Sequence, residues 1–156
     1  MRFYGFGNYY LSSLQQGLQS AHLVGELFTQ NSIGGSKSNQ VFDWAKNHKT
    51  MVLLNGGNSK DLQELFDFLN SSENPYAFAK FHEDEDSLGG ALTYVGVVLP
   101  SFIYDLAYFI RTSSNDYEYD SVNEAIKKLK PVLTVTKLSQ FEFSLCEKLN
   151  TFSLAK

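Results

Sequence analysis

The chain has 156 residues, which is enough for one domain of ordinary size and too few for two comfortable ones. Hydrophobic residues make up 43% and charged residues 19%, a balance typical of a folded globular protein and not of a disordered one. The formal net charge of -4 argues against broad binding to a nucleic-acid backbone, because such binding needs clustered Lys and Arg.

The single cysteine, Cys146, excludes an intramolecular disulfide and a zinc site built from cysteines. It falls within the apolar periodicity of the last predicted helix, so we expect a core residue there. No apolar run approaches the roughly 20 residues of a membrane span, and the aromatic N-terminus is unlike a signal peptide. These features predict a cytoplasmic protein with no membrane partner.

The first half of the chain alternates strand and helix signals. Phe and Tyr at alternating positions favour a first strand, and Ser12 or Ser13 is the expected N-cap of an amphipathic helix. The continuous apolar run Thr50–Leu54 is typical of a strand buried on both faces. The elements predicted here are a strand over 2–10, helices over 13–30 and 40–47, a strand over 50–54 and a helix over 61–70.

The second half adds two strands and then only helices. An acidic loop and a Gly-Gly turn separate the two strands, which suggests an antiparallel pair. The elements predicted here are strands over 76–81 and 91–99, helices over 102–110, 123–130 and 137–152, and a polar loop over 115–120. We therefore predict an α/β fold, a three-layer α/β/α core over 1–100 with a four-stranded mixed sheet. A C-terminal helical extension over 101–156 is expected to pack on the same domain.

The first helix carries a polar stripe at regular spacing. At 100° per residue, four polar residues fall on one narrow arc, and an apolar set that we expect to be buried falls on another. The polar set is Gln15, Gln19, His22 and Glu26, and the apolar set includes Leu14, Leu18, Ala21 and Phe28. The stripe is either a solvated face or a ligand-binding face. The second interpretation gains weight because no Lys or Arg occurs from Phe3 to Gly35.

A glycine turn follows the apolar strand. Asn55, Gly56, Gly57 and Asn58 stand between that strand and the start of a helix. Ligands bind at the carboxyl ends of strands in open α/β sheets, and backbone N–H groups at such a turn can hold a phosphate. A plain left-handed turn explains the glycines equally well. The Lys-Ser/Thr of a P-loop is missing, which disfavours nucleotide hydrolysis of that type.

The acidic run His82–Asp86 offers oxygen ligands for a divalent cation. No second acidic cluster with matching spacing occurs, so a solvated loop is the simpler interpretation. We expect no metal and no cofactor.

The segment from Ser12 to His22 resembles the first-helix motif of the type II peptidyl-tRNA hydrolase family. Gln19 and His22 match the glutamine and histidine of that motif, and Leu92-Thr93 resembles the start of its closing strand. The likeness covers about 1–100. It is greatest to small hydrolase-like proteins of bacteriophages, which share the Gln-Gly-Leu-Gln and Asn-Gly-Gly-Asn patterns. It implies the hydrolase fold, with His22 and a carboxylate of the acidic run, Asp86, as catalytic groups if the chain is an enzyme.

The departure from the motif lies at Gln15, where the family has a lysine. A glutamine cannot supply the cation that would hold a phosphate or assist attack on an ester. The first hypothesis is therefore a module that binds a small nucleotide-type ligand without turnover, and in a bacteriophage it would sequester a host immune signal. The predicted ligand-binding residues are Gln15, Gln19, His22, Glu26, Asn55, Gly56, Gly57, Asn58 and Thr93.

Two alternatives remain at this point. One is a peptidyl-tRNA hydrolase or related esterase, which would have tRNA as its partner but lacks the basic surface that tRNA demands. The other is a protein–protein adaptor that uses the C-terminal helices. The sequence leaves a homodimer open.

Overall fold

The structure is a computed structural model that describes residues 1–112, 120, 123–124 and 137–155. The chain divides into two compact units, one from Met1–Leu99 with the residues from Phe152 onward, and one within Pro100–Thr151. The first unit contains, in chain order, β1 (Arg2–Gly7), α1 (Ser13–Gln30), α2 (Ser36–Asp43), the π-helical turn η1 (Trp44–His48), β2 (Met51–Asn55), α3 (Ser59–Leu69), β3 (Phe78–His82), α4 (Glu85–Leu88) and β4 (Leu92–Leu99). The second unit contains α5 (Ser101–Thr112) and α7 (Gln140–Leu149).

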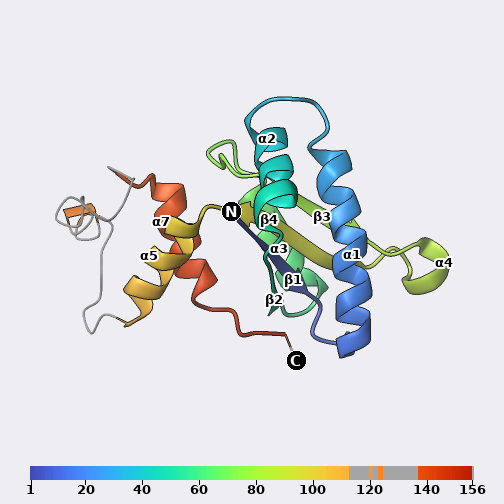
Figure 1. The fold of residues 1–156 in the computed structure, drawn as a ribbon. Helices are drawn as coiled ribbons and strands as arrows, with labels where there is room; N and C mark the ends of the chain where they lie inside the picture. Colours follow the sequence, from blue (N-terminus) through green and yellow to red (C-terminus); the bar gives the residue numbers. More distant parts are fainter. Residues whose placement is uncertain (113–119, 121–122, 125–136, 156) are drawn as a thin grey trace. The chain divides into compact units, whose positions relative to one another are not determined.

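The first unit is built on a four-stranded mixed sheet in the order β2-β1-β4-β3 (Figure 1). β1 and β2 run parallel, whereas β4 runs antiparallel to both β1 and β3. The α/β class, the mixed sheet of four strands and the antiparallel closing pair are confirmed.

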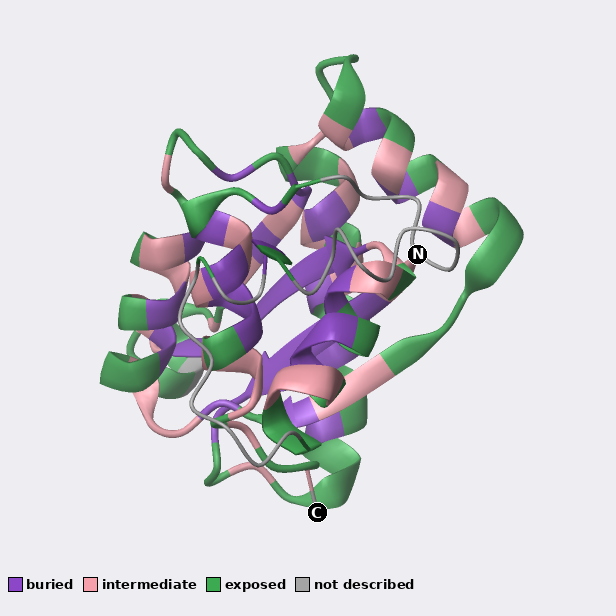
Figure 2. Ribbon diagram, turned by 90° about the vertical axis from the view of Figure 1, so that its left-hand side faces the viewer, coloured by how far each residue is buried: buried purple, intermediate pink, exposed green. Residues whose placement is uncertain are grey.

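Helices cover both faces of this sheet. Tyr94 of β4 lies in one apolar core with Leu23 of α1 and Trp44 of η1. Alternate residues point to the other face, where Phe66 of α3 meets Phe78 of β3 with 5.7 Å between ring centroids. The central strands β1 and β4 are almost wholly buried, while α1 and α3 each turn one side inward (Figure 2).

α1 begins where the sequence predicts. The Ser12 hydroxyl accepts a hydrogen bond from the backbone N–H of Gln15 at 3.4 Å. The Gln15 amide oxygen accepts one from the backbone N–H of Ser12 at 2.9 Å. This reciprocal capping box satisfies two of the N–H groups that the first turn leaves unpaired.

The inward face of α1 differs from the prediction. Its buried residues are Gln16, Ser20, Leu23 and Leu27. Leu14 is 75% exposed, Leu18 is 54% exposed, and Ala21 is also exposed, so their predicted burial is wrong. Phe28 is half-buried and packs against Phe42 of α2. The buried arc differs from the predicted one because the polar side chains of Gln16 and Ser20 are buried and hydrogen-bonded.

Gln16 is the clearest case. Its Nε2 donates to the backbone oxygen of Asn8 at 3.0 Å, and its Oε1 accepts from the hydroxyl of Tyr94 at 2.6 Å. Gly7 makes room for this pair, since a Cβ there would lie 2.0 Å from Gln16 Oε1. Burial raises the pKa of Tyr94 to about 12.

β2 is an edge strand and is not buried on both faces, which corrects the expectation for the apolar run. Met51 is 39% exposed. The end of the chain covers part of the outer edge, because Asn55 N donates to Ser153 O at 2.9 Å and Ala155 N donates to Leu53 O at 3.0 Å. Residues that the sequence groups with the C-terminal extension thus pair with the sheet of the first unit.

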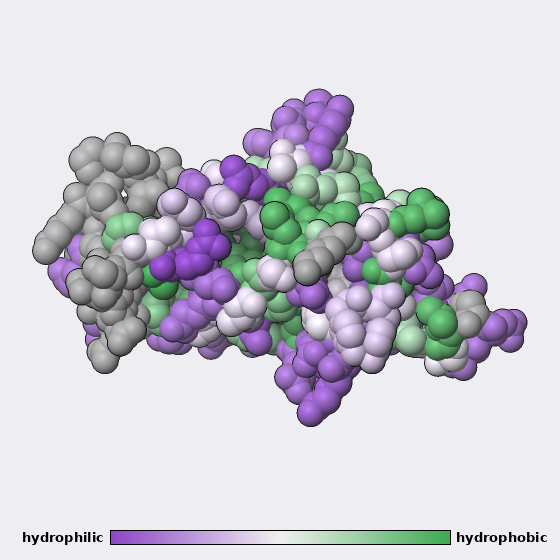
Figure 3. Space-filling model, turned by 90° about the horizontal axis from the view of Figure 1, so that it is seen from below, coloured by the Kyte–Doolittle hydropathy of each residue, from purple (hydrophilic) through white to green (hydrophobic). Residues whose placement is uncertain are grey.

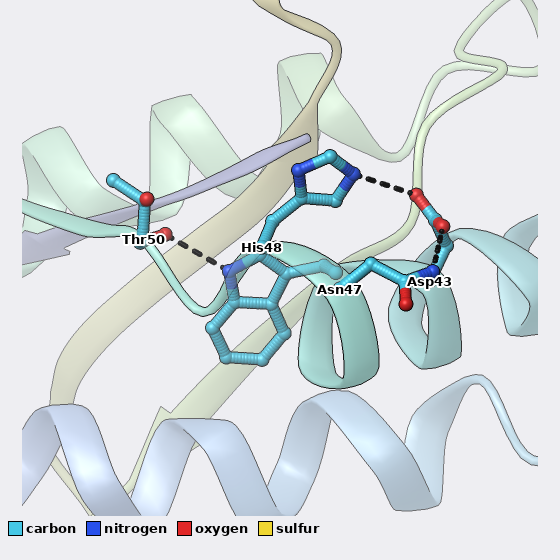
Figure 4. A network of polar contacts seen from close by, with 5 residues as sticks. Asp43, Asn47, His48 and Thr50 are labelled. Carbon is cyan, nitrogen blue, oxygen red and sulfur yellow. Dashed lines mark hydrogen bonds and ion pairs between the residues drawn. The ribbon is translucent and has the colours of Figure 1, made fainter.

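The turn that leads into β2 is fixed by side chains of η1 and α2 (Figure 4). Trp44 Nε1 donates to the backbone oxygen of Thr50 at 2.9 Å. Asp43 accepts from Asn47 at 2.8 Å and contacts His48 at 3.1 Å. The hydrogen bond from Asn47 is the main reason that the pKa of Asp43 lies below its ordinary value.

Within the second unit, α5 and α7 are joined by packing and by polar contacts. Asn150 Nδ2 donates to the backbone oxygen of Ala107 at 2.9 Å, and Cys146 is buried with its Sγ 3.6 Å from Ile103 O. Burial raises the pKa of the Cys146 thiol to about 12, so the prediction of a core cysteine is confirmed. Most of the loop predicted over 115–120 and of the helix predicted over 123–130 lies outside the described residues.

Candidate functional site

The predicted polar stripe lies along one side of α1, next to β3 and the residues that follow it. We define the α1–β3 flank as Gln19, His22 and Glu26 of α1 together with Phe81 and Glu83. Gln19 and Glu26 are half-buried, and His22 is exposed. The structure therefore brings three of the predicted residues together with an aromatic ring and a carboxylate.

Gln19 and Glu83 form the polar centre of the flank. Gln19 Nε2 donates a hydrogen bond to Glu83 Oε1. A carboxylate can only accept, so the amide nitrogen must face it and the amide oxygen must point elsewhere. Gln19 Oε1 is buried, and no donor among the described residues reaches it. Buried acceptors are rarely left unpaired in folded proteins, which marks this oxygen as the unusual atom of the flank.

His22 and Glu26 continue the flank. The His22 ring stands edge-on to Phe81, with 4.9 Å between centroids and 90° between planes. Glu26 Oε2 accepts from Gln30 at 2.8 Å. Gln30 in turn pairs with the backbone of Lys80 on the outer edge of β3. Glu26 therefore helps to hold the helix against the strand.

Gln15 belongs to the N-terminal cap of α1 and not to the centre of the flank. Its amide oxygen accepts from the backbone N–H and from the hydroxyl of Ser12, both at 2.9 Å. Its side chain is thus engaged in holding the first turn.

The backbone N–H groups of the Asn55–Asn58 turn already have hydrogen-bond partners in the protein. Gly56 N donates to Gly7 O, Gly57 N to Asn55 Oδ1, and Asn58 N to the carboxylate of Asp61. The Asn58 side chain caps α3 by accepting from the N–H groups of the next turn. Gly57 has a φ of +83°, which favours glycine. The turn therefore presents no cradle of unpaired N–H groups for a phosphate.

Thr93 lies between Leu92 and Tyr94 of β4, where the pairing with β3 shifts register. Thr93 is 3% exposed, and its hydroxyl has no hydrogen-bond partner among the described residues. The structure therefore shows no hydrogen bond from the Thr93 side chain to the described residues of the flank.

The carboxylate that meets the stripe is Glu83, three residues before the predicted Asp86. Asp86 is exposed in α4, and no contact with His22 is recorded for it. Within the described residues, no group of three His, Cys, Asp or Glu side chains could hold a metal ion.

Lys80 and Arg2 could in principle supply the cation that Gln15 lacks, but neither is placed at the flank. Lys80 Nζ lies 4.2 Å from the ring centroid of Phe66, on the α3 face of the sheet. Arg2 stands at the start of β1, paired with Leu99 and at the opposite end of the strand from Gly7. No ion pair to Glu83 is found in the part of the chain that the structure describes.

Two exposed tyrosines lie where β1 leads into α1. The rings of Tyr9 and Tyr10 are 3.9 Å apart at their centroids, and Tyr9 N donates to Gly57 O. The contact with Tyr10 is the main cause that raises the pKa of Tyr9. The loops after the two parallel strands therefore meet at one edge and present aromatic surface there.

Comparison with known proteins adds no family: no family model matches the chain, and no curated protein matches it. Among the described helices, none is long and apolar enough to cross a membrane. Any proposal about function therefore rests on the geometry of the α1–β3 flank.

Proposed function

We propose that the α1–β3 flank binds the base of a small nucleotide-type ligand and holds it without turnover. The observation that carries this proposal is the buried Gln19 Oε1, which has no partner among the described residues, beside the Glu83 carboxylate. The described residues leave that oxygen unpaired, and an N–H donor from a ligand would satisfy it once the half-buried side chain turns the oxygen outward.

The charge of the flank selects which part of a nucleotide would bind. Gln19 Oε1 and Glu83 supply acceptors and one negative charge, and no Lys or Arg contact with them is recorded in the described residues. A phosphate would be repelled there, whereas N–H groups of a base would be favoured. Guanine carries several N–H donors on one edge and is the base that suits this set best. The exposed ring of His22 offers a surface on which the base can stack.

Capture suits the chain better than turnover because Gln15 replaces the lysine of the resembled family and is engaged in a helix cap. The biological role that we propose is that of a phage-encoded protein that sequesters a host nucleotide signal. A hydrolase acting on peptidyl-tRNA or a related ester is the second candidate, and the presence of His22 and Glu83 on the same flank favours it.

Calorimetric titration with GMP, AMP, CMP and UMP tests the proposal. We expect GMP to bind most tightly and Gln19→Met to abolish that binding. Gln63→Met is the matched control, because Gln63 also donates to a carboxylate, Asp67, at 2.7 Å but lies on α3. The control should bind GMP as the wild type does.

Three results would count against capture. They are no binding of any of the four nucleotides, equal binding by Gln19→Met, and cleavage of peptidyl-tRNA that disappears in His22→Ala. The last result would establish the hydrolase instead. Mass spectrometry of small molecules released on denaturing the purified protein would identify a natural ligand.

A further inference from the structure

The two outer edges of the sheet are covered by different means. At β3, side-chain amides of α1 and α2 bond to backbone groups of the outer edge, and Gln30 does so twice with Lys80, at 3.0 and 3.3 Å. Asn31 donates to Phe78 O at 3.0 Å, and Gln40 bonds to the chain just before the strand. Because these amides belong to helices packed on the sheet, this edge is closed to a further strand.

At β2, the cover is a short piece of chain from far along the sequence. We define the covering segment as Phe152–Ala155. It runs antiparallel to β2 with Leu154 opposite Leu54, and its pairing rests on the two backbone hydrogen bonds described above. The Phe152 ring packs against Phe6 of β1, with 4.7 Å between centroids. The covering segment is thus a short additional strand at this edge.

The covering segment is held by little buried surface. Its residues Phe152 and Ala155 are half-buried, whereas Leu154 is 69% exposed. Met51, at the start of β2, is 39% exposed, and apolar side chains also stand open among polar ones on the surface seen in Figure 3. A segment with few backbone bonds and little buried apolar surface opens at a small cost in free energy while the core stays folded.

The covering segment is joined to the strands of the sheet through the second unit. The chain leaves the first unit after Leu99 and returns to it at Phe152, so Pro100–Thr151 stand between β4 and the segment in sequence. The hydrogen bond from Asn150 to Ala107 lies within the second unit. Release of the segment from β2 therefore leaves this contact intact.

We propose that the β2 edge exchanges its occupant, so that the covering segment of a second copy of this chain pairs there in place of the protein's own. The same residues meet in both arrangements, which makes such an exchange a low-cost route to a dimer. Backbone pairing at the edge supplies the attraction, and Phe152 against Phe6 sets the register. No residue of the α1–β3 flank takes part, so the exchange is independent of the proposed nucleotide binding.

Disulfide trapping between two variants tests the proposal on the full chain. Leu54 and Leu154 are a directly opposed antiparallel pair flanked by hydrogen bonds, and the Cα atoms of such pairs lie about 4.5 Å apart, within reach of a disulfide. Leu54→Cys mixed at high concentration with Leu154→Cys should give a linked heterodimer on oxidation, because each variant carries one half of the bridge. Cys146 is buried with a pKa raised to about 12, so its thiol does not compete.

Three controls make the trapping specific. Leu54→Cys mixed with Leu88→Cys should give several-fold less heterodimer, because Leu88 is 55% exposed but lies on α4. The double variant Leu54→Cys, Leu154→Cys should close a disulfide within one chain at low concentration, which checks the pairing itself. If Leu54→Cys does not fold by circular dichroism, Leu53→Cys with Ala155→Cys repeats the test one position along.

Two results would overturn the proposal. The first is an internal disulfide in the double variant with no heterodimer above the Leu88→Cys control in the mixture, which would show that the segment stays on its own sheet. The second is no disulfide in either experiment, which would contradict the pairing on which the exchange depends. Mass spectrometry of the linked peptides identifies the two cysteines in each case.

Discussion

Gln16 and Gln19 are two glutamines one turn apart on α1, and they show opposite kinds of polar burial. Gln16 faces the core and uses both ends of its amide, one for Asn8 and one for Tyr94. Gln19 faces β3 and uses only its nitrogen, while its buried oxygen has no partner among the described residues. The first amide is part of the fold, while the second has spare hydrogen-bonding capacity. Residue type alone therefore does not separate the two glutamines, whereas the hydrogen bonding of each amide does.

The largest effect on stability is expected from replacing Gln16. Gln16→Ala removes the partners of two buried groups and leaves a cavity, so we expect the free energy of unfolding to fall by about 3 kcal/mol. Urea denaturation measures this change in the free energy of unfolding. An unchanged midpoint would show that Gln16 is not the structural member of the pair.

Alkaline pH should weaken the same contact. The pKa of Tyr94 is about 12 in the folded protein and about 10 for an exposed tyrosine. The unfolded chain thus releases this proton at lower pH than the folded protein does. The contribution of Tyr94 is fully present below pH 10 and is lost as the pH rises through 12.

Melting curves of the wild type and of Tyr94→Phe at rising pH measure how much of the pH dependence of stability comes from Tyr94. The variant should lose about 1 kcal/mol at neutral pH through its missing hydrogen bond. It should then lose less than the wild type above pH 10. Parallel curves for the two proteins at every pH would contradict the assignment.

The smallest effect on stability is expected on the Gln19 side. Gln19→Met gives up a half-exposed hydrogen bond but also removes an unpaired buried acceptor, so the two changes offset each other. We expect the free energy of unfolding to stay within about 0.5 kcal/mol of the wild type. A loss as large as that of Gln16→Ala would make both glutamines structural.

The sequence predicted the order of the four strands and of the longer helices between them, because their periodicities are strong, but it did not predict the short helix α4. It also placed Gln19, His22 and Glu26 on one side of α1, which helical spacing alone determines. It misjudged the buried arc, since Leu14 and Leu18 were assigned to the core and the burial of Gln16 was not foreseen. Only the tertiary partners Asn8 and Tyr94 make burial of Gln16 favourable.

The partners of the flank could be predicted only in part. The resemblance placed an acidic residue beside the stripe, and the structure selects Glu83 over Asp86 because β3 and its continuation bring position 83 next to α1. The glycine turn looked like an anion site because its residue types fit one. Its N–H groups, however, are taken up by its own loop, by Gly7 and by Asp61, which no local pattern shows in full.

The side-chain amide signals of Gln16 and Gln19 in a nitrogen-15 NMR spectrum test the central claim most directly, since each glutamine is a control for the other. Loss of a signal in Gln16→Ala or Gln19→Met assigns it. On titration with GMP we predict that the Gln19 signal moves and saturates while the Gln16 signal stays in place. A Gln19 signal that does not move with any of the four nucleotides would contradict the account.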